Sequence, residues 1–405
     1  MSITRRTVLG TAVSLPLIGR ARAQGAPVKI GVLNDMSGVY RDISGATSAA
    51  CVRQAVEDFG NQGLTVEIVT GDHQNKPDIG TAIARKWIDQ EGVDMIIDVA
   101  NSALGLAING VCKEKDRAYI NSTAATADLT GPACAPTTIH WTYDTWMLAH
   151  STGGAMVKAG GDTWFFVTAD YSFGTALQRD TTAFVEKAGG KVLGSVRHPF
   201  PGNTDYSSFL LQAQASKAKV IGICNAGTDT VNTIKQAAEF GIAESGIKLA
   251  GLLVFLNDVH ALGLQTAQGL VLTESFYWDL NDRTRAFTKR VLPKTGGAHP
   301  AMSHAGCYGG ALHYLKACAA MGQAEAKKSG AATIARMKSM PTDDDAFGQG
   351  SIREDGRKIH PVYLFEVKKP GESKVPWDYY KLLATTPADQ AFRPLGEGGC
   401  PLVHA

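Results

Sequence analysis

The sequence predicts an α/β protein of two lobes, each built on a parallel sheet. Short apolar runs alternate along the chain with longer amphipathic stretches, and this alternation is typical of parallel strands joined by crossover helices. The pattern runs from about residue 28 to 121 and resumes from about 164 to 273, which predicts a second lobe. The chain of 405 residues is 44% hydrophobic and 19% charged, a composition typical of globular proteins.

The first 23 residues have the features of an export signal. They contain four arginines and no acidic residue, with an apolar run from Val8 to Ile18 and the small-x-small sequence Ala21-Arg22-Ala23 at the end. The apolar run is too short to span a bilayer as a helix. The segment Thr4 to Leu9 resembles a twin-arginine export signal, with an ordinary secretory signal as the alternative. We expect cleavage near Ala23, which makes residues 1–23 a signal peptide.

Loss of this segment would change the charge of the chain. The full sequence has 40 basic and 38 acidic side chains, and removal of four arginines would leave 36 basic against 38 acidic. This balance argues against a nucleic-acid partner, because phosphate binding needs a basic surplus. No later stretch is apolar enough for a membrane span, so we expect a soluble, exported mature protein.

The first lobe is predicted from four strands and the helices between them. Each strand is a short run of buried-type residues, and each helix repeats apolar residues every three or four positions. The expected strands cover residues 28–33, 65–69, 93–98 and 118–121. The expected helices cover residues 44–59, 77–91 and 102–115.

The second lobe follows the same pattern, and further helices come after it. The expected strands cover residues 164–168, 191–196, 220–224, 248–254 and 270–273, and the expected helices cover 172–188, 206–215 and 229–240. Later helices, at about 284–292, 303–321 and 331–340, have no strands between them, so we expect them to pack back on the first lobe. Residues 362–368 predict a last strand, and the Gly-rich stretch 395–400 predicts a loop.

Seven cysteines in an exported chain raise the question of disulfides. The odd number leaves at least one free thiol. Cys112 and Cys134 flank one predicted strand, and we expect this pair to bond. Cys224 lies in an apolar run and is expected to be a small buried residue. The sequence has no CxxC motif and no close pair of histidines on one helix face, so neither a metal nor a cofactor is expected.

A ligand site is expected at the ends of the predicted strands. In open parallel sheets, ligands bind beyond the carboxyl ends of the strands. Ser102 and Thr126 lie near predicted helix starts, where a hydroxyl and free backbone N–H groups suit a carboxylate. The alternative is that such residues only cap helices. Candidate residues at these strand ends are Asn101, Ser102, Thr123, Ala124, Thr126 and Asn225.

Aromatic residues near these ends are further candidates for the site. Aromatic residues at strand ends are better pocket candidates than those inside helices. They are Tyr40, Tyr143, Tyr171, Phe173, Phe255, Tyr277 and Trp278.

The sequence contains no GxSxG, HExxH, Walker A or GxGxxG motif, so we expect a protein without catalytic activity.

Several motifs, taken in order, resemble a known family. The export signal, the run Val28–Leu33 with Met36-Ser37-Gly38, the stretch Asn121–Thr130 and the segment Asp170–Gly174 are similar to type I periplasmic solute-binding proteins of ABC importers, the branched-chain amino acid-binding class. The resemblance covers essentially the whole mature chain. It implies a monomeric periplasmic protein that delivers a small carboxylate ligand to a permease in the inner membrane.

The resemblance also implies an architecture of two Rossmann-like α/β lobes with parallel sheets, joined by a hinge that the chain crosses three times. The first lobe would comprise residues 26–145 and 279–355. The second would comprise residues 146–278 and 356–390, with 391–405 as a C-terminal tail.

Family members hold the ligand carboxylate with a hydroxyl after the third strand and with an Ala-Ala-Thr loop. The positions that match here are Ser102, Ala124 and Thr126, and Phe173 matches an aromatic residue that covers the ligand. Amino-acid binders also place an acid on the second lobe for the ligand ammonium. The matching stretch, Leu253–Asn257, has none, which favours an aromatic or hydrophobic acid over a branched-chain amino acid.

Three functions follow from these observations. The leading hypothesis is a binding protein that closes around a small carboxylate between its lobes and delivers it to an ABC permease. A periplasmic receptor that presents its closed form to a membrane signalling protein would have the same fold. An exported hydrolase is the third hypothesis, and the absence of a nucleophile motif argues against it.

Overall fold

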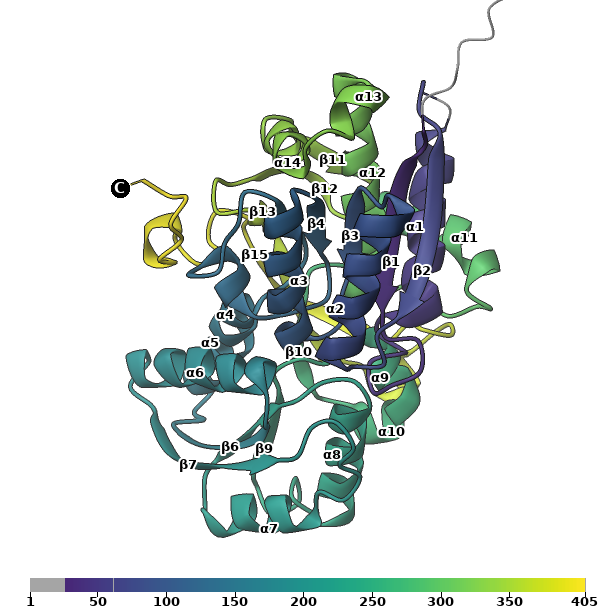
Figure 1. The fold of residues 1–405 in the computed structure, drawn as a ribbon. Coiled ribbons are helices and arrows are strands. Elements are labelled where there is room, and N and C mark those ends of the chain that lie inside the picture. Colours follow the sequence, from purple (N-terminus) through teal and green to yellow (C-terminus); the bar gives the residue numbers. More distant parts are fainter. Residues whose placement is uncertain (1–25, 61, 405) are drawn as a thin grey trace, which may run out of the picture.

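The computed structural model describes residues 26–60 and 62–404, and its fold is drawn in Figure 1. The predicted signal peptide, residues 1–23, lies outside the described residues. Within the part of the chain that the structure describes, no helix is long and apolar enough to cross a membrane.

The first lobe is built on a five-stranded parallel sheet with the strand order β2-β1-β3-β4-β5. Its register places Ile30 of β1 beside Ile68 of β2 and Met95 of β3. The strands are β1 Val28–Asn34, β2 Val66–Asp72, β3 Met95–Asp98, β4 Ala118–Asn121 and β5 Thr138–His140. Four were predicted, whereas the three residues of β5 are too few to show a period.

Helices in this part of the chain follow the predicted positions closely. They are α1 Gly45–Phe59, α2 Pro77–Lys86 and α3 Ser102–Lys115, with a π-helical turn, η1 Trp87–Glu91, completing the predicted second helix. Asn101 caps α3 by accepting a hydrogen bond from the Leu104 N–H at 3.0 Å, which satisfies one of the free donors at the helix start.

The late helices pack back on the first lobe, as predicted. The helix α12 (Met302–Met321) lies along α1 and is followed by α14 (Gly330–Lys338). Nearly the whole circumference of α12 is buried. Glycines let it approach the sheet closely, since a Cβ on Gly310 would lie 2.7 Å from the Ile120 side chain. The other helices of this stretch are α11 Asp282–Val291, η4 Leu292–Lys294 and α13 Gln323–Ala326.

The second lobe is built on a four-stranded parallel sheet with the order β7-β6-β8-β9, drawn in teal in Figure 1. Its strands are β6 Thr163–Ala169, β7 Lys191–His198, β8 Val220–Cys224 and β9 Lys248–Gly251. The longer helices are α6 Ser172–Lys187, α7 Ser207–Ala215 and α8 Thr228–Glu239. Short helices also occur at α4 Thr145–Leu148, η3 Ala149–Gly153, α5 Gly154–Lys158, α9 Leu256–Leu262 and α10 Leu264–Ala267.

The strand predicted at 270–273 exists but does not extend a parallel sheet. As β10 (Val271–Glu274) it pairs antiparallel with β14 (Val362–Val367), which pairs antiparallel with β15 (Tyr380–Thr386). A second small antiparallel sheet contains β11 Thr342–Asp344, β12 Gly348–Ile352 and β13 Lys358–Ile359.

The predicted loop at 395–400 contains the short 3-10 turn η6 Leu395–Glu397. Two other 3-10 turns, η2 Ala127–Thr130 and η5 Pro370–Glu372, come earlier in the chain. The residue ranges of the two lobes stay a prediction.

The predicted disulfide between Cys112 and Cys134 is wrong. Cys134 bonds instead to Cys400, with a Cα–Cα distance of 5.6 Å and a sequence separation of 266. Cys112 is fully buried in the apolar cluster that contains residues of α3 and of the sheet, and its thiol is free. Five cysteines of the described chain are free and buried: Cys51, Cys112, Cys224, Cys307 and Cys318.

A buried arginine joins the chain after β12 to the segment after β5. The Arg357 side chain is fully buried, pairs with the Asp144 carboxylate at 3.2 Å and donates to the Thr142 carbonyl. Its Nε donates to the Lys358 carbonyl at 3.0 Å. Burial lowers the pKa of Arg357 to about 10, and the Asp144 charge opposes this shift, so the guanidinium stays protonated at neutral pH.

We expect the Arg357→Ala variant to lower the free energy of unfolding by about 3–5 kcal/mol, because it leaves the Asp144 carboxylate buried without its partner. Urea unfolding at pH 7 measures the change. Arg336→Ala, at an exposed position of α14, is the matched control and should stay within about 0.5 kcal/mol of the unchanged protein. A loss for Arg357→Ala no larger than that of the control would contradict the importance of this ion pair.

Candidate functional site

A small cavity, with a free volume of about 10 Å³, lies between the lobes. Its lining residues follow the carboxyl ends of strands from both parallel sheets, β1, β3, β4 and β5 on one side and β6, β8 and β9 on the other. This is the location that the architecture of open parallel sheets favours for a ligand. The lining residues are Tyr40, Ile43, Ala100, Asn101, Ser102, Thr123, Ala124, Ala125, Tyr143, Tyr171, Phe173, Ala226 and Leu253.

Eight of the residues named as ligand candidates from the sequence line this cavity. They are Tyr40, Asn101, Ser102, Thr123, Ala124, Tyr143, Tyr171 and Phe173. Five lining residues were not predicted: Ile43, Ala100, Ala125, Ala226 and Leu253. These are small or apolar, and in a sequence they look the same as core residues. Their positions directly after strands were the one available signal.

The start of α3 reaches the cavity at Ser102. The Ser102 hydroxyl, at the first residue of the helix, accepts a hydrogen bond from the Thr126 N–H at 3.2 Å. This bond satisfies the Thr126 N–H and uses the Ser102 hydroxyl as an acceptor. The helix N-terminus adds a favourable field for a negative charge. Thr126 itself does not line the cavity, and its backbone N–H lies beside Ser102.

Other polar groups on the first-lobe wall are bound to the protein itself. Asn121 donates to the Ala124 carbonyl at 2.6 Å and accepts from the Ala124 N–H at 2.9 Å. The Thr123 hydroxyl donates to the buried Asp98 carboxylate, which also accepts from Ser44 at 2.9 Å. Ala124 and Thr123 therefore shape the wall, whereas the Ser102 hydroxyl accepts a hydrogen bond from the backbone N–H of Thr126.

The turn after β3 holds a strained backbone beside the cavity. Asp98 and Val99 have φ angles of 87° and 64°, in the left-handed region that a β-branched residue such as Val rarely adopts. The Asp98 carboxylate, with its pKa raised by burial, accepts hydroxyl hydrogen bonds under the cavity floor. The turn directs Ala100–Ser102 to the cavity.

Aromatic rings from both lobes line the cavity and meet across it. Tyr171, from the turn between β6 and α6, stacks on Phe200 at 4.0 Å between ring centroids, and its hydroxyl contacts the Tyr40 hydroxyl of the first lobe. Tyr143 donates to the Thr123 carbonyl at 2.7 Å. Burial raises the pKa of Tyr40, Tyr143 and Tyr171, so these hydroxyls are neutral at pH 7.

The two lobes also touch through their backbones, in a closed arrangement. The Thr228 N–H donates to the Val39 carbonyl at 3.2 Å. Gly227 has a φ of 60°, and a Cβ there would lie 2.5 Å from the Val39 oxygen. A residue without a side chain is therefore needed at this point of approach.

Three of the remaining candidates lie away from the cavity. Phe255 packs edge-on behind Tyr143 at 5.5 Å between centroids. Asn225 is buried and uses its amide on Thr233, at 3.0 Å, and on neighbouring side chains. Trp278 donates to the Trp377 carbonyl at 2.8 Å. Trp278 and Tyr277 both follow β10. Because β10 belongs to the antiparallel sheet, the end of β10 does not open into the cavity.

No charged side chain lines the cavity among the described residues. Of the stretch Leu253–Asn257, Leu253 alone reaches it. The nearby acids are buried: burial raises the pKa of Asp229 and of Asp258 to about 7 and raises the pKa of Glu274 strongly. In the described part of the chain, no group of three or more His, Cys, Asp or Glu side chains could hold a metal ion.

Comparison with known proteins agrees with this architecture. The family model described as "Periplasmic binding protein" matches residues 27–372. The chain belongs to this family. The periplasmic binding protein family implies a periplasmic location, and its members bind solutes for ABC transporters without catalysing a reaction.

Solved structures extend the match. A periplasmic binding protein from Burkholderia mallei is 49% identical, with a TM-score of 0.89, over 93% of this chain and 99% of that one. A branched-chain amino acid ABC transporter periplasmic ligand-binding protein from Burkholderia xenovorans is 38% identical, with a TM-score of 0.81, over the same shares.

More distant relatives match over most of the chain. A Leu/Ile/Val-binding protein homolog 4 from Brucella melitensis is 22% identical over 95% of each chain. Two solute-binding proteins from R. palustris, solved with benzoate and with 4-hydroxybenzoate, are 22% and 24% identical, with a TM-score of 0.80 for each. They cover 93% and 90% of this chain, which covers 100% and 98% of theirs.

The buried Asp229 of this periplasmic binding protein predicts a pH effect on stability. Its folded-state pKa of about 7 exceeds the ordinary value of 3.8, so the folded protein binds the proton more tightly than the unfolded chain. The resulting stability is present at low pH and is lost as pH rises from about 4 to about 7.

We expect Asp229→Asn to gain stability relative to the unchanged protein between pH 5 and pH 8, by on the order of 2 kcal/mol. Urea unfolding at both pH values measures the difference. Asp282→Asn, at a fully exposed side chain, is the control and should show no such trend. An Asp229→Asn difference that is the same at both pH values would contradict the assignment.

Proposed function

We propose that this protein captures a small aromatic carboxylate in the cavity between its lobes and delivers it, as a monomer, to an ABC permease. One observation carries the proposal: the cavity is lined by aromatic rings and hydroxyls, without a charged side chain, and has one exchangeable donor pair for an anion. The closed arrangement of the lobes supports capture by hinge closure, in which ligand contacts with both lobes stabilise the closed state.

The carboxylate of the ligand would lie at the start of α3. There the Thr126 N–H, which donates to the Ser102 oxygen in this structure, and the Ser102 hydroxyl would each donate one hydrogen bond to the ligand, and the helix field favours the negative charge. Ser102 is buried, so water would not screen these bonds. No arginine or lysine is needed, because hydrogen bonds from neutral groups and the helix terminus stabilise the charged form.

The ring of the ligand would lie among the aromatic side chains. Phe173 and Tyr171 come from the second lobe, and Tyr40 and Tyr143 come from the first. Rings of this kind pack well on a flat apolar body, and the neutral tyrosine hydroxyls can pair with a ring hydroxyl. The R. palustris proteins solved with benzoate and 4-hydroxybenzoate support this ligand class.

A branched-chain amino acid is the second candidate. The names of the Burkholderia xenovorans and Brucella melitensis relatives favour it. Its ammonium group would need an acid in the cavity wall, and the described lining residues supply none. Burying an ammonium without a partner is costly, which places this candidate behind the aromatic acids.

A receptor that signals from its closed form would use the same cavity. The relatives that belong to ABC transporters favour transport over signalling.

We expect aromatic carboxylates to raise the melting temperature of the purified protein. The panel is benzoate, 4-hydroxybenzoate and 3,4-dihydroxybenzoate, with leucine, isoleucine and valine as the competing class. A ligand at 100 times its Kd stabilises the folded state by about 2.7 kcal/mol, which a thermal-shift assay detects. Benzamide, which lacks the negative charge, is the control and should give no shift. Shifts with the amino acids alone would overturn the proposal.

We expect Ser102→Ala to weaken binding of the best ligand of this panel about tenfold or more, because a hydrogen bond to a charged group contributes about 1.5–3 kcal/mol. Isothermal titration calorimetry measures the Kd. Ser351→Ala, at an exposed position of β12, is the matched control and should bind as the unchanged protein does. A Kd for Ser102→Ala equal to that of the control would show that the carboxylate binds elsewhere.

A further inference from the structure

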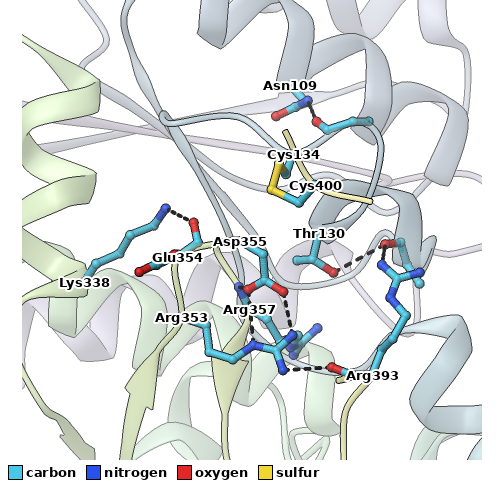
Figure 2. Close-up of a disulfide and its surroundings, with 12 residues drawn as sticks. Asn109, Thr130, Cys134, Lys338, Arg353, Glu354, Asp355, Arg357, Arg393 and Cys400 are labelled. Atoms are coloured by element: carbon cyan, nitrogen blue, oxygen red, sulfur yellow. Dashed lines mark hydrogen bonds and ion pairs between the residues drawn. A yellow bond between two sulfur atoms is a disulfide. The ribbon is translucent and has the colours of Figure 1, made fainter. Parts of the chain in front are cut away.

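The C-terminal segment 391–400 lies against the loop that forms part of the cavity wall. The family match ends at residue 372, so this segment lies beyond it. Figure 2 shows the disulfide between Cys134 and Cys400 above a group of arginines that includes Arg393. The segment therefore joins the body of the protein at a covalent contact and at polar contacts.

The loop held in this way, residues 121–134, runs from the cavity to the disulfide. Its first part includes Thr123–Ala125 in the cavity wall and the Thr126 N–H beside Ser102. The η2 turn follows directly, and Cys134 comes four residues after its last residue, Thr130. A shift of η2 would therefore move the Thr126 N–H.

Polar contacts fix this turn from the side of the tail. The Arg393 guanidinium donates to the Ala127 carbonyl at 2.9 Å, one residue after Thr126. The two backbones also approach closely, since a Cβ on Gly131 would lie 2.8 Å from the Gly398 carbonyl oxygen and 2.8 Å from the Arg393 guanidinium. The Cys134–Cys400 bond then closes the far end of the same contact.

The base of the tail is itself anchored to the buried arginine of the fold. The Phe392 ring lies 4.2 Å from the Arg357 guanidinium carbon and is buried. Arg353 donates to the Arg393 carbonyl at 2.8 Å (Figure 2). Arg357 in turn bonds to Thr142 and Asp144, which flank the cavity residue Tyr143.

We infer that segment 391–400 is a clamp that positions the carboxylate-binding loop, with Arg393 as a positioning residue and the Cys134–Cys400 disulfide as its lock. This inference rests on the proposed function, because the clamped group is the Thr126 N–H assigned above to the ligand carboxylate. A site that is held by a second layer of contacts keeps its donors in place and loses less entropy on binding. Because the disulfide persists in an oxidising compartment, it keeps the ligand site formed there.

The test uses the full mature chain and four variants: Cys400→Ser, the double variant Cys134→Ser/Cys400→Ser, Arg393→Ala and the control Arg336→Ala. Hydrogen exchange is measured without ligand, at a temperature where circular dichroism shows every variant folded. We expect the peptides that cover 122–134 to exchange at least about threefold faster in the clamp variants, with β1 and β3 unchanged. General destabilisation by loss of a disulfide would instead raise exchange in the core strands as well.

The second measurement is the Kd for 4-hydroxybenzoate by calorimetry, expected to rise about threefold or more in the clamp variants and to stay unchanged in Arg336→Ala. Unchanged exchange in 122–134, or faster exchange with an unchanged Kd, overturns the clamp. The exchange measurement needs no ligand. It therefore still supports or overturns the positioning of the loop if the unchanged protein binds no aromatic carboxylate, an outcome that overturns the proposed function instead.

Discussion

The structure depends on one geometric constraint, the convergence of the carboxyl ends of two parallel sheets. Crossover helices return each chain segment to the same edge of its sheet, so all strand ends of a lobe meet on one side. Seven such ends contribute residues to the cavity. The positive φ angles of Asp98 and Val99 lie at that edge, at the end of β3, where the chain turns toward the cavity. Closure then needs one further condition, a close approach at Gly227 that a side chain would block.

Most polar groups in the cavity wall are already satisfied, and this decides its chemistry. Asn121 binds both backbone groups of Ala124, and Asp98 takes the Thr123 hydroxyl. Such fixed bonds leave a wall that is polar in composition but presents few donors to a ligand. A site of this kind selects by shape and by one anion position, because every other polar group would have to give up a partner. Neutral tyrosine hydroxyls complete the wall without adding charge.

Buried charge holds the region behind the cavity together. Arg357 and Asp144 lie between the segment after β5 and the chain that leads into β14. Removal of such a pair from water is expensive, and the hydrogen bonds to Thr142 and Lys358 offset part of that cost. The same guanidinium packs against Phe392 of the tail. One buried cation therefore joins the segment after β5, which carries the cavity residue Tyr143, to the C-terminal segment.

The sequence by itself determined the helices and strands and the residues that come directly after each strand. Short apolar runs predicted β1 to β4 and β6 to β9. The central strands β3, β6 and β8 are buried on both faces, which leaves a continuous apolar signature, whereas the edge strands β2 and β7 are only partly buried. Position after a strand was enough to find Ser102, Tyr143 and Phe173, since parallel strands deliver their ends to one place. Tertiary structure alone decided which distant segments meet. The pairing of Cys134 with Cys400 joins residues 266 apart, and the antiparallel placement of β10 removed Trp278 from the cavity. Neither leaves a local pattern in the sequence, because both depend on contacts between segments that the chain brings together only on folding.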